Sequence, residues 1–215
     1  MTTLPMFPLG SVLLPGEAIT LHVFEPRYRR LVIDCLDATA ADTPADFGIV
    51  LIERGSEVGG GDVRADAATR VRIARIDPLE GGRFALIVVG LSRIRVTRWL
   101  PDDPYPQADV ADWPDEPSGD VFDMMNEIQL RLDTARDLAV ATTDFQATAP
   151  PLPQIDLKDA ELASFQLSAA APIGPADRYR LLVAPSARER MNILDRVLDD
   201  VEAAFRFRLS EPHSP

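Results

Sequence analysis

The chain of 215 residues has few of the side chains that bind metals or form disulfides. It contains one cysteine, Cys35, and two histidines, His22 and His213. A single cysteine excludes an internal disulfide, and this set is too small for a tetrahedral zinc site. Cys35 lies on the apolar face of a predicted helix, which indicates a buried thiol. We therefore expect no metal and no other cofactor.

Long apolar runs are also missing. No run approaches the roughly 20 residues that are needed to cross a bilayer. Prolines from Pro5 onward interrupt the N-terminal segment, which disfavours a secretory signal. The hydrophobic fraction of 46% and the charged fraction of 26% are those of an ordinary globular protein. These features predict a cytoplasmic protein that makes no membrane contact.

Positive charge is scarce as well. Lysine and arginine together number 22 against 34 acidic residues, which gives a formal net charge of −12. Binding to a phosphate backbone generally needs a surplus of basic residues, so this balance disfavours nucleic acid as a partner. It favours solubility and discrimination toward cationic or apolar partners.

The residues that are present divide the chain into two halves, which predict an α+β fold. Residues 1–115 contain short β-type runs separated by Gly, Pro and Asp, with one helix near the start, as in a small β-barrel or curled sheet. Gly90 is expected to break one of these strands. Residues 116–209 follow helical spacing and predict a helical bundle, with one helix from about Leu157 capped by Asp156. Residues 210–215 show no periodicity, which predicts a disordered tail.

The stretch around Phe24-Glu25-Pro26-Arg27-Tyr28 predicts a strand that runs directly into a helix. Apolar residues alternate with others from Ile19 to Phe24, which is the period of a half-buried strand. One helical face then carries Tyr28, Leu31, Val32, Cys35 and Leu36. Proline is tolerated at the first helical position, and the macrodipole favours the charge of Glu25 beside it.

This arrangement resembles the start of the N-terminal, substrate-binding domain of Lon proteases. The positions that fill the family pattern are Leu4, Pro5, Phe7, Pro8, Leu9, Pro15, Gly16, Leu21, Phe24, Glu25, Pro26, Arg27 and Tyr28. Similar matches occur at Gly90–Val96 and at Ser186–Arg190, where Ser186 and Glu189 form a capping box. The resemblance implies a PUA-like β lobe followed by a helical bundle, in a stand-alone member without ATPase or peptidase domains.

The sequence lacks the groups that would make such a chain an enzyme. Lys158 is the only lysine, and no glycine-rich turn precedes it, which excludes a Walker A loop. No serine-rich motif precedes it either, so the serine–lysine dyad of Lon proteolysis is missing. The segment from Gly90 to Ile94 lacks the second glycine of a nucleophile elbow. We predict a non-enzymatic chain with no catalytic residue.

Binding is then the expected activity, and the resemblance favours exposed or unfolded segments of other proteins as partners. Such sites are apolar grooves with few polar groups, or sheet edges that accept an added strand. The candidate peptide-binding residues are Phe24, Glu25, Arg27 and Tyr28, and we expect the site between the two lobes. A structural role competes for three of them, because Arg27 can pair with a carboxylate and Tyr28 begins the buried stripe of the helix.

Two alternatives remain open. Arg70 and Arg72 share one strand face, as do Arg93 and Arg95, and together they could form a basic patch that binds RNA or another polyanion. The same arginines could instead form the solvated face of a sheet with acidic neighbours. The other alternative is an adaptor that docks on an AAA+ protease without binding substrates itself.

Overall fold

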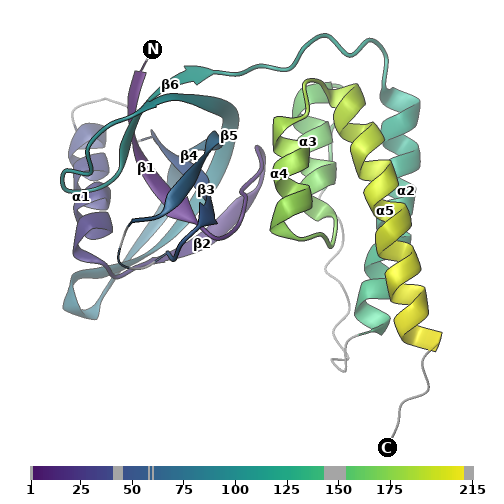
Figure 1. Cartoon of the computed structure of the whole chain (residues 1–215), viewed down its shortest axis with the longest axis horizontal. Helices are drawn as coiled ribbons and strands as arrows, with labels where there is room; N and C mark the ends of the chain where they lie inside the picture. The colour runs from purple at the N-terminus through teal and green to yellow at the C-terminus, as the bar shows by residue number, and fades with distance from the viewer. Residues whose placement is uncertain (1, 41–45, 58, 60, 143–153, 211–215) are drawn as a thin grey trace, which may run out of the picture. The chain divides into compact units, whose positions relative to one another are not determined.

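The computed structural model describes residues 2–40, 46–57, 59, 61–142 and 154–210 (Figure 1). The chain forms two compact units, Met1–Pro114 and Asp115–Pro215, which we call the β unit and the helical unit. The predicted disordered tail begins at Ser210, which the structure places at the end of the last helix. The rest of that tail lies outside the described residues.

In the part of the chain that the structure describes, the β unit contains a six-stranded sheet and one long helix. Its elements are β1 Thr2–Leu9, β2 Ala18–Val23, α1 Pro26–Ala40, β3 Asp46–Arg54, β4 Val63–Leu79, a 3-10 turn at Glu80–Gly82, β5 Arg83–Trp99 and β6 Gln107–Asp112. The strand order is β2-β5-β4-β3-β1-β6, and β5 also pairs with β6. This last pairing closes five of the strands into a ring, so the unit is the small β-barrel that the sequence predicts.

The core of the β unit forms between the strands and the apolar stripe of α1. Tyr28, Leu31, Val32 and Cys35 are all buried, as the helical spacing predicts. They belong to a cluster with side chains of β1, β2, β3, β4 and β5. The stripe is narrower than predicted, because Leu36 keeps 39% of its surface exposed. Burial of this face, rather than helix propensity, is the main source of stability for such a helix.

One prediction about the strands is wrong. Gly90 does not break a strand, because β5 continues from Arg83 to Trp99 and pairs Gly90 with Val71. The glycine instead allows a close backbone approach: a Cβ atom there would lie 2.6 Å from the carbonyl oxygen of Leu14. β4 extends to Leu79 through its pairing with β5, so the connection between the two strands is the 3-10 turn at Glu80–Gly82.

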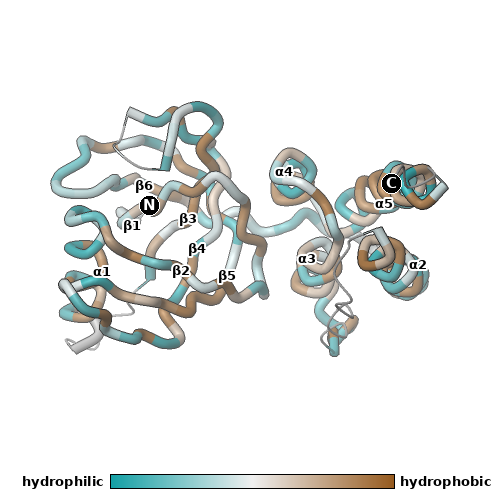
Figure 2. Tube along the Cα trace, turned by 90° about the horizontal axis from the view of Figure 1, so that it is seen from below, coloured by the Kyte–Doolittle hydropathy of each residue, from teal (hydrophilic) through white to brown (hydrophobic). Residues whose placement is uncertain are grey.

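The helical unit contains α2 Phe122–Ala141, α3 Ala160–Ala170, α4 Pro175–Val183 and α5 Ala187–Ser210. Figure 2 looks nearly along these helices and shows apolar and polar stretches alternating around them. Their apolar faces form one buried cluster that includes Met125, Leu167, Leu181 and Leu194. This is the bundle that the helical spacing predicts.

The helix starts follow capping chemistry, with one correction. Ser186 Oγ accepts a hydrogen bond from the Glu189 N–H at 3.3 Å, which confirms half of the predicted capping box. The predicted cap at Asp156 is wrong, because α3 starts later. Asp159 accepts from the Leu162 N–H at 3.1 Å and caps the helix, whereas Asp156 accepts from the Lys158 N–H in the preceding turn.

A buried arginine organises the helical unit. Arg190 is 0% exposed and holds Asp115, the first residue of the unit, through hydrogen bonds of 2.7 and 2.8 Å to the two carboxylate oxygens. It also donates to the Leu181 carbonyl at 3.0 Å and to Ser164 Oγ at 2.6 Å, and its guanidinium lies 3.4 Å from the ring centroid of Phe165. Sequence spacing alone gave no sign of this network.

Candidate peptide-binding pocket

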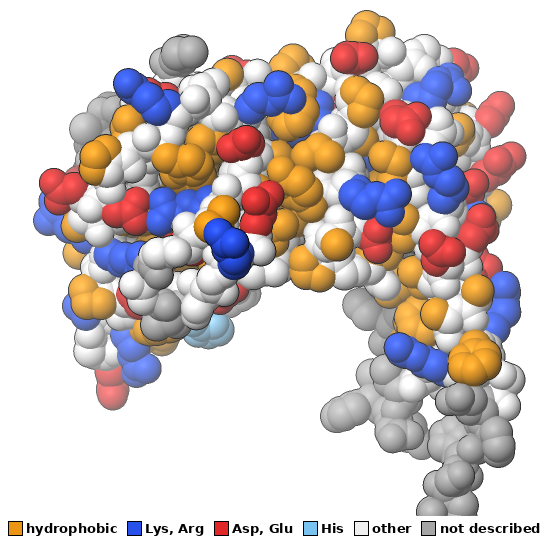
Figure 3. Space-filling view, in the orientation of Figure 1, with side chains coloured by type: hydrophobic (Ala, Val, Ile, Leu, Met, Phe, Trp, Pro, Cys, Tyr) orange, Lys and Arg blue, Asp and Glu red, His pale blue; other side chains and the backbone are white. Residues whose placement is uncertain are grey.

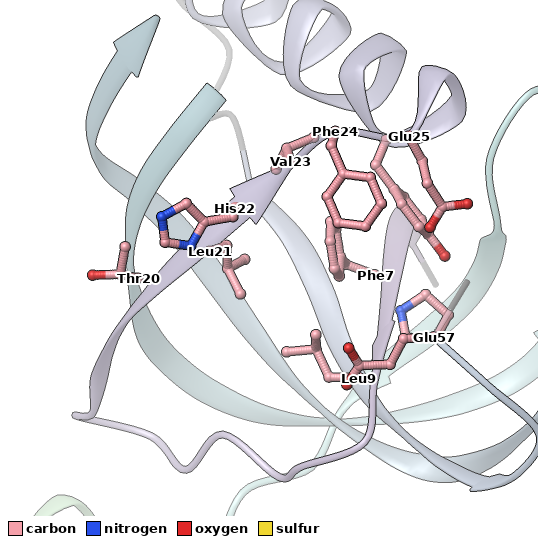
Figure 4. Close-up of a pocket in the computed structure, with 11 residues that line it drawn as sticks. Phe7, Leu9, Thr20, Leu21, His22, Val23, Phe24, Glu25 and Glu57 are labelled. Atoms are coloured by element: carbon pink, nitrogen blue, oxygen red, sulfur yellow. The ribbon is translucent and has the colours of Figure 1, made fainter. Parts of the chain in front are cut away.

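A pocket of about 290 Å³ lies in the β unit, where β1 ends and β2 leads into α1 (Figure 4). The residues that line it are Phe7, Pro8, Leu9, Thr20, Leu21, His22, Val23, Phe24, Glu25, Tyr28 and Glu57. Most of these side chains are apolar, and the polar ones include two glutamates. This composition is typical of sites that bind an apolar group and orient it with a few polar contacts.

The sheet topology explains why a pocket forms at this place. Among the described residues, β2 pairs only with β5 and is therefore an edge strand. The residues of β1 that pair with β6 are Thr2–Pro5, and its last residues pair with β3 on the other side. The pocket therefore lies between a free edge of β2 and the part of β1 that β6 does not cover. Free strand edges can accept an added strand.

Aromatic rings form one wall of the pocket. Phe7 of β1 stacks on Tyr28 of α1, with ring centroids 4.3 Å apart and an interplanar angle of 30°. Leu21 and Val23 are buried beside them, whereas Phe24 is 53% exposed. A half-exposed phenylalanine beside buried rings offers a contact surface without being needed for the core.

Polar contacts hold the rim. The Glu25 carboxylate pairs with Arg27 Nε at 3.2 Å, and the Arg27 guanidinium lies 4.5 Å from the ring centroid of Tyr28. Arg27 also reaches the Glu57 carbonyl at 3.5 Å. The Glu57 carboxylate accepts a hydrogen bond from the Gly10 N–H at 2.5 Å. These contacts connect the loop after β3 to β1 and to the start of α1.

The structure brings three of the four candidate peptide-binding residues together. Phe24, Glu25 and Tyr28 line the pocket, whereas Arg27 does not line it and holds Glu25 in place. The expected site between the two lobes is a different location from this pocket, which is formed by the β unit alone. Sequence reasoning missed Thr20, His22 and Glu57. The alternation of the strand could have indicated the first two, but the loop that carries Glu57 offered no signal.

Burial raises the pKa of Tyr28 from its ordinary value of 10.0 to about 12, and Glu25 adds to the shift while Arg27 opposes it. Among the described residues the phenolic hydroxyl has no hydrogen-bond partner. The proton is therefore lost from the unfolded chain at lower pH than from the folded one. The contribution of the Tyr28 hydroxyl to the free energy of unfolding is fully present below pH 10. It falls as the pH rises from 10 to 12.

We expect Tyr28→Phe to remove this dependence. Near neutral pH the variant should match the parent within about 1 kcal/mol, because the ring stays and the hydroxyl is unpaired. Above pH 10 the parent should lose about 1.4 kcal/mol per pH unit more than the variant. Urea unfolding of both proteins across this range measures the difference. Parallel losses in the two proteins would contradict the assignment.

The four arginines of the alternative site do not form one basic patch. Arg93 is 1% exposed and donates to the Trp113 carbonyl at 2.9 Å. It pairs in register with Thr69 and so lies on the sheet face opposite to that of Arg70. Arg93 is thus a buried structural residue, and its charge faces no solvent.

The other three arginines have partners nearby. Arg72 bonds to Asp46 at 2.8 Å, and Arg70 bonds to Asp112 at 3.0 Å. The Arg95 guanidinium lies 3.8 Å from a ring centroid of Trp113. On the face drawn in Figure 3, basic and acidic side chains are interspersed. Arg70 and Arg72 thus have the acidic neighbours that the interpretation of a solvated sheet face expects, whereas Arg95 lies against Trp113.

Two further features bear on the class of protein. Within the described ranges, no group of three or more His, Cys, Asp or Glu side chains could hold a metal ion. No helix among the same residues is long and apolar enough to span a membrane. The described chain thus combines a β-barrel unit that carries an apolar pocket with a helical bundle.

Comparison with known families establishes the relationship. The family model described as the ATP-dependent protease La (LON) substrate-binding domain matches residues 3–200. The chain belongs to this family. A search of curated proteins finds no match to this chain.

Solved structures agree with the family. The Lon N-terminal domain protein from Xanthomonas campestris is 29% identical, with a TM-score of 0.61, over 93% of this chain and 98% of that one. The N-terminal domain of the Mycobacterium avium complex Lon protease shares the fold at 16% identity and a TM-score of 0.55, over 94% of this chain and 98% of that one. The predicted family and the α+β fold are therefore confirmed.

Proposed function

We propose that the chain is a non-catalytic module that binds exposed, extended segments of protein substrates in the pocket between β1 and β2. The observation that carries this proposal is an apolar pocket that lies beside the free edge of β2. The membership of a substrate-binding family supports it. One apolar side chain of the segment would enter the pocket, and its backbone would run along β2.

The backbone of β2 is suited to such an addition. The Gly90 N–H donates to the Glu17 carbonyl at 2.8 Å, so Glu17 and Gly90 are a hydrogen-bonded pair at the start of the ladder between β2 and β5. Because hydrogen-bonded pairs alternate in an antiparallel ladder, the N–H and C=O groups of Thr20 and His22 face away from β5. Both residues line the pocket. A peptide strand could therefore bond to this edge and place alternate side chains into the pocket.

We expect Phe24→Ala to weaken binding of a labelled unfolded protein about tenfold or more, because a buried aromatic contact is worth about 1.5–3 kcal/mol. Phe122→Ala is the matched control, since Phe122 is 51% exposed and lies on α2. Fluorescence anisotropy gives both dissociation constants, and thermal unfolding checks that each variant folds. Equal weakening by the two variants, or none by Phe24→Ala, would sink the pocket assignment.

A second variant tests the strand edge. His22→Pro removes an N–H that faces away from β5, and proline is tolerated at such edge positions. It should weaken peptide binding while the fold is retained.

A labelled RNA titrated in parallel at low and high salt covers the polyanion alternative. Tight, salt-sensitive RNA binding without any peptide binding would overturn the proposal.

A further inference from the structure

We propose that the pocket selects segments in which a lysine or arginine lies within two residues of the apolar anchor. This inference rests on the proposed function and adds the charge of the substrate to it. It is carried by Glu25 and Glu57, two carboxylates from distant parts of the chain that line one apolar pocket beside the exposed ring of Phe24 (Figure 4).

The charge at the rim is negative. The Arg27 guanidinium lies close to both glutamates. It bonds to the side-chain carboxylate of Glu25 but only to the backbone carbonyl of Glu57. Within the part of the chain that the structure describes, the Glu57 carboxylate forms no ion pair and accepts a hydrogen bond from the Gly10 N–H. Two carboxylates thus face one guanidinium, which leaves Glu57 available to a basic side chain of a ligand.

The neighbouring aromatic ring strengthens the preference. Lysine and arginine place their aliphatic stems along apolar surfaces while the charged head remains at a polar group. A cation also interacts favourably with the face of an aromatic ring such as that of Phe24. An extended peptide repeats side chains on one face about every 7 Å. A basic residue two positions from the anchor can therefore contact the rim while the anchor fills the pocket.

The net charge of the chain acts in the same direction at longer range. The formal charge of −12 attracts cationic segments and repels acidic ones. This general attraction would not depend on a single glutamate, whereas recognition at the rim would. The experiment separates the two by neutralising one carboxylate at the pocket and one away from it.

The test uses three labelled peptides with one phenylalanine anchor in a polar background. They differ only at the position two residues from the anchor, which is lysine, glutamine or glutamate. We expect the lysine peptide to bind the parent protein about fivefold more tightly than the glutamine peptide at low salt, and the glutamate peptide to bind more weakly than both. The preference should shrink at high salt because exposed charges are screened.

Glu57→Gln should abolish most of the preference for lysine over glutamine, measured as the ratio of the two dissociation constants, so that any change common to both peptides cancels. Glu53→Gln is the matched control, because Glu53 is exposed on β3 and does not line the pocket. Equal binding of the three peptides, or an unchanged preference in Glu57→Gln, would overturn the inference and leave the proposed function standing. If the glutamine peptide does not bind, or binds Phe24→Ala as well as the parent, both proposals fail.

Discussion

Replacement of Arg190 by methionine should lower the free energy of unfolding of the helical unit by about 3–5 kcal/mol. The guanidinium is fully buried and forms hydrogen bonds with Asp115, Ser164 and the Leu181 carbonyl. Methionine fills a similar volume but removes the guanidinium that bonds to both oxygens of the buried Asp115 carboxylate. The cost of that uncompensated charge exceeds the gain from a better apolar side chain.

The two units carry different spectroscopic probes, so the loss can be assigned to the helical unit when the tryptophan signal, which reports the β unit, is followed beside the helix band. Both tryptophans, Trp99 and Trp113, lie in the β unit, whereas α2, α3, α4 and α5 lie in the helical unit. Chemical unfolding followed by circular dichroism at the helix band should show the loss. Arg196→Met is the control. Arg196 is exposed, and its ion pair with Glu189, at 3.6 Å, is a weak surface pair. A loss below about 1 kcal/mol for Arg190→Met would refute the role of the buried arginine.

Arg190→Lys refines this prediction. Lysine keeps the positive charge but cannot donate in parallel to both carboxylate oxygens of Asp115. We expect its free energy of unfolding to lie between that of the parent and that of Arg190→Met. An Arg190→Lys protein as stable as the parent would show that charge alone, rather than the planar hydrogen-bonding geometry, holds Asp115.

Arg93→Glu should destabilise the β unit by about 3 kcal/mol or more, because it places an unpaired carboxylate in a buried position next to carbonyl oxygens. Arg93 donates to the Trp113 carbonyl at 2.9 Å, and its guanidinium lies 4.2 Å from a ring centroid of that residue. Arg95→Glu changes the same charge two residues away, on an exposed side chain. It should cost less than about 1 kcal/mol.

Chemical unfolding followed by tryptophan fluorescence compares the two variants through their transition midpoints. Similar midpoints would contradict the burial of Arg93. The comparison also decides how a polyanion assay is interpreted. Loss of RNA binding in Arg93→Glu would report a damaged fold, whereas the same loss in Arg95→Glu or Arg72→Glu would report a direct contact with the exposed sheet face.

The candidate site shows which signals a sequence carries. The segment from Phe24 to Tyr28 was predicted as a strand entering a helix, and three of its residues line the pocket. This was predictable because the alternation of a strand and the spacing of a helix are local patterns. Phe7 of β1 and Glu57 of the loop after β3 line the same pocket because β1 pairs in parallel with β3. No local pattern encodes that pairing.

The arginines make the same point about burial. Arg93 and Arg95 stand two residues apart on one strand and have the same alternation with apolar neighbours. Arg93 is buried because the chain after β6 returns across it at Trp113 and Pro114. Arg95 stays exposed on the same strand.

The amino-acid sequence alone determined the family, the order of a β-barrel unit and a helical bundle, and the strand-to-helix joint at Phe24–Tyr28. The family follows from the match of individual residues to a known pattern. The order of the two units and the joint follow from hydrophobic periodicity, turn residues and capping, which act over a few residues. Only the tertiary structure decided that Glu57 reaches the joint, that Arg93 and Arg190 are buried, and that a free strand edge borders the pocket. Such features depend on which distant segments pair and on which side chains lose contact with water.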